Sequence, residues 1–345
     1  MALRCAAVLE RTRVLIIGAG PIGLEVAWEL KRRGIDYVQV DRGQVGSTVS
    51  WFPEAMTFFS SSDRIGICGL PLQTPGQRKA TKEEYLDYRR GVAIARDLPV
   101  RTFEEVVALE SGFVATTRRA DGEHRIEADA IVLATGDMAR PRLLGIPGED
   151  LAHVSHYFHG PHEHFRRRLL VVGGKNSAVE AALRCWHAGA HVTLSYRGAE
   201  FPEKSVKYWL LPELKGRIHR GEITCHFNTE PVRITPTQVV LRSDGGELEV
   251  AADSVLLMTG YVADMRLFEA LGATLEGASQ SPVLDEQTME TSVPGLYAAG
   301  TSTAGTQHGY TLFIENCHIH ATRIAAALAG ETPPPAPPPI TLPES

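Results

Sequence analysis

A glycine-rich turn between a strand pattern and a helix pattern constrains the fold of this chain more than any other feature. Residues 13–17 (RVLII) have the apolar run of a buried strand, and GAGPIG at 18–23 follows directly. Residues 22–33 (IGLEVAWELKRR) then carry apolar side chains at helical spacing. A second strand pattern, IDYVQVD, covers 35–41. This order predicts a βαβ unit with a dinucleotide-binding turn.

Each glycine of the turn has its own task in such a unit. Gly18 permits the tight turn, Gly20 lets the backbone approach a pyrophosphate, and Gly23 lets the helix pack against the strand. The N–H groups at the start of the helix face the phosphate charge. Asp41 follows about 20 residues later, where a carboxylate accepts hydrogen bonds from adenosine ribose hydroxyls. These features predict a first dinucleotide site.

The same order of elements returns in the second half of the chain. The strand pattern at 169–172 leads into GGKNSA at 173–178, then a helix pattern at 179–189 and a strand pattern at 191–197. Lys175 stands where the first turn has its central glycine, and it adds a positive charge near the phosphates. Two such units predict two bound dinucleotides.

The second unit favours a dinucleotide with a 2′-phosphate. Tyr196 occupies the position that matches Asp41, and Arg197 comes next. No carboxylate is then present to repel the phosphate, and the arginine can pair with it. Lys204 and Lys207 could support the same phosphate, although each cation is also explained as a surface charge. We therefore expect NADPH rather than NADH.

Composition limits the function classes. The chain has 345 residues, enough for two domains, with a hydrophobic fraction of 43% and a net charge of -6. The charge argues against a nucleic-acid surface, no apolar run reaches the roughly 18 residues of a membrane span, and MALRCAAVLERTR is too interrupted for a secretory signal. Five widely spaced cysteines without a CxxC indicate neither a disulfide framework nor a zinc site. We expect a cytoplasmic protein that acts on a small molecule.

Three further motifs connect the two units. They are ADAIVLATG at 128–136, VLLMTGY at 255–261 and GLYAAGT at 295–301. Together they resemble the two-dinucleotide flavoprotein reductases of the thioredoxin-reductase-like branch. The resemblance implies an α/β fold of two Rossmann-like domains, which often pair into homo-oligomers.

In that branch the nicotinamide domain is inserted into the FAD domain. The resemblance therefore implies a discontinuous FAD-binding domain at 1–141 and 285–330, and an NADPH-binding domain at 142–284. Residues 331–345 (ETPPPAPPPITLPES) are expected to form a disordered, proline-rich tail.

The resemblance narrows to one family. Matching segments are TFFSSS at 57–62, GGKNSA at 173–178, SVKYWLLPEL at 205–214, TGY at 259–261 and FIEN at 313–316. They resemble the YpdA family of proposed bacillithiol disulfide reductases, and the agreement covers about residues 13–328. In such a family NADPH reduces FAD, and FAD reduces the disulfide of a small thiol.

The motifs and the resemblance together assign residues to the two cofactors. For FAD they are Gly18, Gly20, Pro21, Ile22, Gly23, Asp41, Arg42, Ser47, Phe59, Ser60, Thr135, Gly136 and Gly300. For NADPH they are Gly173, Gly174, Lys175, Asn176, Ser177, Ala178, Arg197 and Lys204.

Three departures from the family patterns affect the chemistry. Thioredoxin reductases carry a CxxC before the second glycine turn, but residues 154–165 contain no cysteine. The YpdA family has its proposed redox cysteine inside the first turn, where this chain has Ile22, and isoleucine cannot attack a disulfide. In the thioredoxin-reductase-like branch an aspartate that holds the flavin ribityl chain usually follows the last motif's glycine, but Thr301 follows Gly300 here.

Several routes for the electrons therefore stay open. Disulfide reduction could use another thiol, with Cys317 first and Cys68 behind it, or direct attack by the reduced flavin. His156 or Tyr157 could donate a proton. The flavin could instead reduce a quinone or oxygen, as in a monooxygenase, or the chain could be a flavin-binding sensor without catalysis.

Five histidines lie close together between the two units. His153, His156, His159, His162 and His164 are irregularly spaced and lack a companion cluster of cysteines or carboxylates. We interpret them as a polar loop over a cofactor or substrate pocket and expect no metal site.

Overall fold

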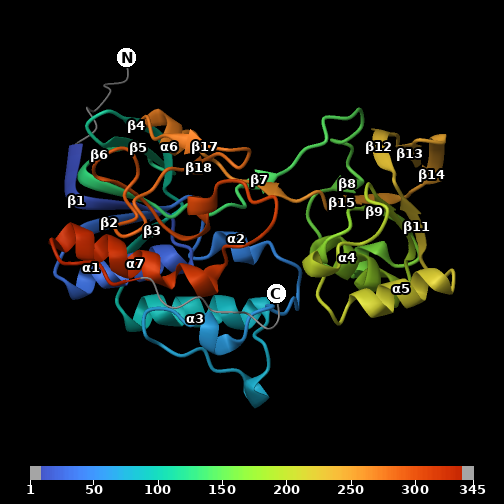
Figure 1. Ribbon diagram of the computed structural model, residues 1–345, viewed down its shortest axis with the longest axis horizontal. Helices are drawn as coiled ribbons and strands as arrows, with labels where there is room; N and C mark the ends of the chain where they lie inside the picture. Colours follow the sequence, from blue (N-terminus) through green and yellow to red (C-terminus); the bar gives the residue numbers. More distant parts are fainter. Residues whose placement is uncertain (1–8, 336–345) are drawn as a thin grey trace. The chain divides into compact units, whose positions relative to one another are not determined.

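The structure of the protein is a computed structural model that describes residues 9–335, without the side chain of Lys204. The chain forms two compact units (Figure 1). The first contains the described residues up to Ser50, then Thr57–Arg140 and the described residues from Tyr261 onwards. The second contains Trp51–Met56 and Pro141–Gly260.

A seven-stranded sheet forms the centre of the first unit. Its order is β3 (Val100–Thr102), β2 (Tyr37–Asp41), β1 (Leu9–Ile17), β6 (Gly122–Leu133), β5 (Val114–Arg119) and β4 (Glu105–Glu110), with β19 (Leu296–Ala298) paired to β6. β1 pairs in parallel with both β2 and β6, so the strand order reverses at β1. In an open sheet of this kind the crevice at such a reversal binds ligands.

The apolar side chains of β1 alternate between two cores. Val14 and Ile16 pack with α1 (Pro21–Arg32) and α7 (Ile314–Ala329), which Figure 1 shows together on one side of the sheet. Leu15 and Ile17 point the other way and pack with α6 (Arg266–Ala270). This alternation explains why residues 14–17 of the strand are all apolar: both faces of the strand are buried there.

The shorter elements of the first unit surround this sheet. α3 (Lys82–Ala95) starts with a capping box in which Thr81 and Glu84 satisfy each other's backbone N–H groups. The others are α2 (Ser47–Ser50), η1 (Ser62–Arg64), η2 (Pro75–Gln77), β16 (Tyr261–Val262), β17 (Leu275–Glu276), β18 (Ser281–Pro282) and η5 (Gly300–Ala304). β7 (Arg140–Pro141) lies where the chain leaves this unit.

The second unit is a five-stranded parallel sheet with two different covers. Its order is β11 (Thr224–Phe227), β10 (His191–Tyr196), β9 (Arg168–Val172), β15 (Ser254–Leu257) and β8 (Val154–Ser155). One face packs on α4 (Asn176–His187) and α5 (Leu211–His219). The other packs on an antiparallel sheet of β12 (Glu230–Ile234), β13 (Gln238–Ser243) and β14 (Gly246–Ala251). η3 (His162–His164) and η4 (Glu203–Ser205) complete the unit.

The predicted α/β fold with two Rossmann-like units is confirmed, and the structure corrects two boundaries. Residues 261–284 belong to the first unit, because Met265 and Phe268 pack in the core that contains Leu15. Residues 51–56 pack with the second unit. Of the proline-rich tail, 331–335 have no regular structure, and 336–345 lie outside the described residues. None of the helices between residues 9 and 335 is long and apolar enough to cross a membrane.

Candidate functional site

The three glycines of the first turn are held to different degrees by the fold. Gly18 has φ +114, and a Cβ there would lie 2.4 Å from the Ala134 carbonyl oxygen. A Cβ on Gly23 would lie 2.2 Å from the carbonyl oxygen of Gly18. A Cβ on Gly20, in contrast, would meet no protein atom within 4 Å. The fold itself therefore requires Gly18 and Gly23, whereas Gly20 borders open space.

Helix α1 presents its first turn without a side-chain cap. Gly20 is the N-cap residue, Pro21 begins the helix, and no side-chain hydrogen bond from the described residues caps it. Uncapped N–H groups and the helix dipole together favour an anion at this end. The open space beside Gly20 lies at the same end, so this turn fits the pyrophosphate of a dinucleotide.

Asp41 connects the glycine turn to the loop after β2. Its Oδ2 accepts a hydrogen bond from the backbone N–H of Ala19 at 2.7 Å, and its Oδ1 accepts one from Gly43 at 2.8 Å. The Ser47 hydroxyl lies 3.4 Å from the same Oδ1. The Nη2 of Arg42 donates to the Ala139 carbonyl at 3.2 Å. The predicted residues Asp41 and Ser47 are thus brought to the turn.

The two later motifs of the first unit meet the same turn. Gly300 has φ +74, and a Cβ there would lie 3.3 Å from the Cβ of Ile22. Gly136 has φ +71, and a Cβ there would lie 3.7 Å from the hydroxyl of Thr301. The buried Thr135 hydroxyl has no hydrogen-bond partner among the described residues. A polar atom without a partner beside an open glycine turn fits a bound flavin dinucleotide.

The predicted residues Phe59 and Ser60 lie in the segment between α2 and η1. Lys79 lies over Phe59: its Nζ donates to the Phe59 carbonyl at 2.5 Å and lies 4.7 Å from the ring centroid.

Sequence reasoning missed a buried arginine behind the first site. Arg89 is 1% exposed, and its Nη2 donates to the Gly46 carbonyl at 3.0 Å. Gly46 in turn donates its N–H to the Ala19 carbonyl of the glycine turn at 3.1 Å. Nε and Nη1 of Arg89 have no partner among the residues described. Nothing in the local sequence of α3 separates Arg89 from the solvated arginine beside it.

The second glycine turn has a modified geometry. Gly173 has φ +139, and a Cβ there would lie 2.6 Å from the Met258 carbonyl oxygen and 3.0 Å from the Cβ of Ala178. A Cβ on Gly174 would lie 2.4 Å from Cδ2 of Tyr196. Lys175 is the N-cap residue of α4, and no side-chain hydrogen bond caps this helix either. The second turn therefore also leaves an uncapped helix start for a phosphate.

Some polar side chains near this turn are bonded within the protein, and others are exposed. The Asn176 Oδ1 accepts the backbone N–H of Lys207 at 2.6 Å, and the Lys207 Nζ lies 3.1 Å from Glu180 in a largely buried ion pair. The side chains of Ser177 and Arg197 are exposed, and neither makes a hydrogen bond or ion pair with a residue within 9–335. The fold thus pairs Lys207 with Glu180 and leaves the Arg197 side chain exposed. The side chain of Lys204 lies outside the described residues.

Comparison with known proteins decides the family. Residues 15–300 match the family described as pyridine nucleotide-disulphide oxidoreductase. The chain belongs to this family. It is 36% identical over 318 residues to the bacilliredoxin reductase Bdr of Bacillus subtilis (strain 168), which spans 92% of this chain and 97% of the relative. It is an oxidoreductase whose family uses a flavin and a nicotinamide cofactor.

Two solved structures confirm the resemblance to the YpdA family. The bacillithiol disulfide reductase Bdr (YpdA) from Bacillus cereus superposes with a TM-score of 0.89 at 34% identity, covering 93% of this chain and 99% of that one. The Bdr (YpdA) of Staphylococcus aureus gives 0.88 at 33% identity, with the same coverage. The thioredoxin reductase of T. acidophilum, at 20% identity and a TM-score of 0.70, shares the fold.

The four cysteines that the structure describes are buried or half-buried. Cys317 is 0% exposed in the core between α1 and α7, and burial raises the pKa of its thiol to about 12. Burial also raises the pKa of Cys185 and of Cys225 to about 12, and it raises the pKa of the 3% exposed Cys68. These four thiols hold their protons at neutral pH, so the structure gives no support to Cys317 or Cys68 as a redox nucleophile. Cys5 lies outside the described residues.

The proposed proton donors His156 and Tyr157 lie in the second unit. The His156 Nε2 is 3.4 Å from Glu149, and burial lowers the pKa of this histidine. The ring of Tyr157 meets that of Trp51 edge-on, with centroids 5.1 Å apart. The histidines around them do not converge, since no group of metal-binding side chains occurs in the part of the chain that the structure describes.

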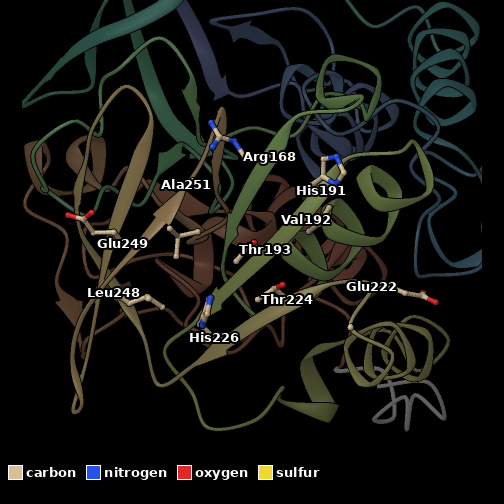
Figure 2. A pocket seen from close by; sticks show the side chains of 12 residues that line it. Arg168, His191, Val192, Thr193, Glu222, Thr224, His226, Leu248, Glu249 and Ala251 are labelled. Carbon is tan, nitrogen blue, oxygen red and sulfur yellow. The ribbon is translucent and has the colours of Figure 1, made fainter.

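Figure 2 shows side chains that line a pocket on the second unit. Arg168, His191 and Thr224, which line it, are the first residues of β9, β10 and β11. Dinucleotides bind at the carboxyl ends of parallel strands. This pocket is therefore not the nucleotide site.

Proposed function

We propose that the protein is an NADPH-dependent FAD enzyme that reduces the disulfide of a low-molecular-weight thiol of the bacillithiol class. The first unit would hold FAD and the second NADPH. When bound, these cofactors supply the two electrons that, with two protons, convert a disulfide into two thiols. The solved relatives carry bacillithiol disulfide reductase in their names, which supports this class of acceptor.

The residues of the first unit would bind and orient FAD. The uncapped start of α1 would hold the pyrophosphate, and Gly20 would leave room for it. Asp41, already fixed by two backbone N–H groups, would accept the ribose hydroxyls. Ile22 would close the floor of the site beside Gly300.

The second unit would select NADPH. Arg197 is exposed and unengaged at the end of β10, where it would pair with the 2′-phosphate. His156 or Tyr157 would supply a proton to a leaving thiolate.

The observation that supports the mechanism is that no described cysteine thiol is exposed to solvent. Ile22 stands against Gly300 where the family has its proposed thiol, and the four described cysteines are buried or half-buried with raised pKa values. We therefore propose that the disulfide is reduced at the flavin itself, with no thiol of the protein as an intermediate carrier.

Cysteine substitution tests this mechanism directly. Single Cys5→Ser, Cys68→Ala, Cys185→Ala, Cys225→Ala and Cys317→Ala variants should each oxidise NADPH with bacillithiol disulfide at about the rate of the unaltered protein, once the FAD content is matched. A variant whose bound flavin is still reduced by NADPH, but which no longer reduces the disulfide, would show a protein thiol in the route.

A quinone or oxygen acceptor is the second candidate. The same observation favours it, because neither acceptor requires a protein thiol. Turnover with a quinone but with no disulfide, in the same assay, would establish it in place of disulfide reduction.

A further inference from the structure

Asp137 is a buried carboxylate that directly follows the ATG motif. It is 7% exposed, and both of its oxygens accept hydrogen bonds. Oδ1 accepts from the Thr301 hydroxyl and Oδ2 from the Gln307 amide Nε2, each at 2.8 Å. Neither partner carries a charge. Because burying a carboxylate is costly without such bonds, these two contacts determine where Asp137 can lie.

Gln307 links Asp137 by hydrogen bonds to the segment that precedes α7. Its side chain is 7% exposed. Its Oε1 accepts the backbone N–H groups of Thr311 and Leu312, and its Nε2 also donates to the Leu312 carbonyl, all at 3.0 Å. Asn316, in the first turn of α7, donates to the Thr311 carbonyl at 2.7 Å. The start of α7 is therefore connected to Asp137 through one fully engaged amide.

Thr301 connects the same carboxylate to the glycine motifs. It lies over Gly136, where a Cβ would be 3.7 Å from its hydroxyl. The preceding Gly300 donates its N–H to Nδ1 of His320 in α7 at 3.2 Å. Three separate segments thus meet at Asp137: the ATG turn, the motif at 295–301, and the entry of α7.

We propose that Asp137 is a positioning residue of the flavin site, which clamps the start of α7 against Thr301 and Gly136 and so fixes the protein surface on which the flavin lies. The inference rests on the proposed function, since it assumes FAD in the first unit. Asp137 takes part in no bond-making step. A residue that only stabilised the domain would leave the bound flavin unchanged, which separates the two roles.

The test compares three substitutions in the full-length protein. Asp137→Asn keeps both contacts, because its amide oxygen can accept from Gln307 and its amide nitrogen can donate to the Thr301 hydroxyl. Asp137→Ala loses both, and Gln307→Leu loses the contact that leads to α7. Asp121→Ala, which removes an exposed carboxylate of the same unit, is the matched control.

FAD would be removed and titrated back into each apoprotein, with the visible absorption spectrum of the bound flavin recorded. We expect Asp137→Ala and Gln307→Leu to raise the dissociation constant of FAD about tenfold or more and to shift the flavin band. Asp137→Asn should stay within about threefold of the unaltered protein, with its spectrum restored. Asp121→Ala should change neither quantity.

Different outcomes overturn different claims. Unchanged FAD affinity and spectrum in Gln307→Leu and Asp137→Ala, whatever their melting temperatures, would overturn the clamp alone. An Asp137→Asn variant that binds FAD as weakly as Asp137→Ala would also overturn it, because the hydrogen bonds to Thr301 and Gln307 would then not determine FAD binding. If Asp137→Ala does not fold, Gln307→Leu and Thr301→Val, which each remove one contact, decide the same question. Failure of the unaltered protein to bind FAD would overturn both this inference and the proposed function.

Discussion

The ring of Tyr196 packs directly against Gly174, so that a Cβ on the glycine would lie 2.4 Å from the ring atom Cδ2. Phe201 stacks on the same ring, with centroids 5.8 Å apart and an interplanar angle of 8°. The matching pair in the first unit is Ala19 and Asp41, where a short carboxylate leaves room for a side chain and accepts the Ala19 N–H. The two nucleotide turns therefore differ at the same two positions. The first turn combines Ala19 with the carboxylate of Asp41, and the second combines Gly174 with the aromatic ring of Tyr196.

This pairing predicts the effect of Gly174→Ala. The added methyl group must displace Tyr196, and we expect a loss of about 1–3 kcal/mol in the free energy of unfolding. The KM for NADPH should rise while the FAD content stays the same. Adding Tyr196→Ser to Gly174→Ala removes the ring and should recover part of the loss. A double variant whose losses are simply additive would show that the two residues are not coupled.

The open space beside Gly20 predicts that a substitution there weakens FAD binding without destabilising the fold. The Cβ of Gly20→Ala would meet no protein atom within 4 Å, and the φ of -68 suits alanine. We expect an unchanged melting temperature of the apoprotein and an FAD affinity weakened about tenfold or more, because the methyl group would take the place of the pyrophosphate. Gly23→Ala, whose Cβ would lie 2.2 Å from the Gly18 carbonyl oxygen, should instead destabilise the apoprotein. Unimpaired FAD binding by Gly20→Ala would place the cofactor elsewhere.

Arg197 should determine the choice between NADPH and NADH. Removal of a charge-assisted contact costs about 1.5–3 kcal/mol, so Arg197→Ala should raise the KM for NADPH about tenfold or more and leave that for NADH nearly unchanged. Arg242→Ala, which removes another exposed arginine of the same unit, serves as the control. Steady-state kinetics with both coenzymes measure the ratio. Equal losses with NADH and NADPH would exclude a specific contact to the 2′-phosphate.

His318 predicts a pH dependence of stability. Its Nδ1 faces Glu25 and its Nε2 faces the Arg64 carbonyl, each at 2.8 Å, so only the doubly protonated ring can donate to both. Burial disfavours the charge, but the hydrogen bond and charge of Glu25 outweigh burial and raise the pKa of His318 above 6.5. The stabilisation is therefore complete below about pH 6.5 and is lost as the pH rises through the folded-state pKa.

Unfolding of a His318→Asn variant at several pH values checks this sign. Its loss of unfolding free energy relative to the unaltered protein should be larger at pH 6 than at pH 9. His191→Asn, which removes an exposed histidine, serves as the control at each pH. A constant or growing loss for His318→Asn towards high pH would contradict the assignment of a charged ring.

Local sequence was sufficient for the parts of the fold that depend on local physics. The glycine turns, α1 and α4, and Asp41 at the end of β2 all follow from periodicity and from the sterics of a strand–turn–helix unit. Local sequence did not predict the ion pair of Lys207. A lysine near a phosphate turn looks available, but it pairs with Glu180 because residues 206–209 fold back onto α4.

The clamp and the domain boundary depend on contacts far apart in sequence. Nothing near Asp137 in the chain indicates that Thr301 and Gln307 meet it. Likewise, nothing near Arg89 in the chain indicates that its side chain meets the loop at Gly46. Residues 261–284 were predicted in the second unit, but Phe268 finds its apolar partners on the back of the first sheet. Such contacts follow from the assembled fold and cannot be read from local periodicity.

Anaerobic mixing of the purified protein with NADPH, followed by bacillithiol disulfide, tests the central claim most directly. The visible flavin absorption should bleach on addition of NADPH and return on addition of the disulfide, with two thiols formed for each NADPH consumed. A flavin that NADPH does not bleach would contradict the assignment of two working dinucleotide sites. A flavin that NADPH bleaches, but that only a quinone or oxygen restores, would contradict the disulfide as the acceptor.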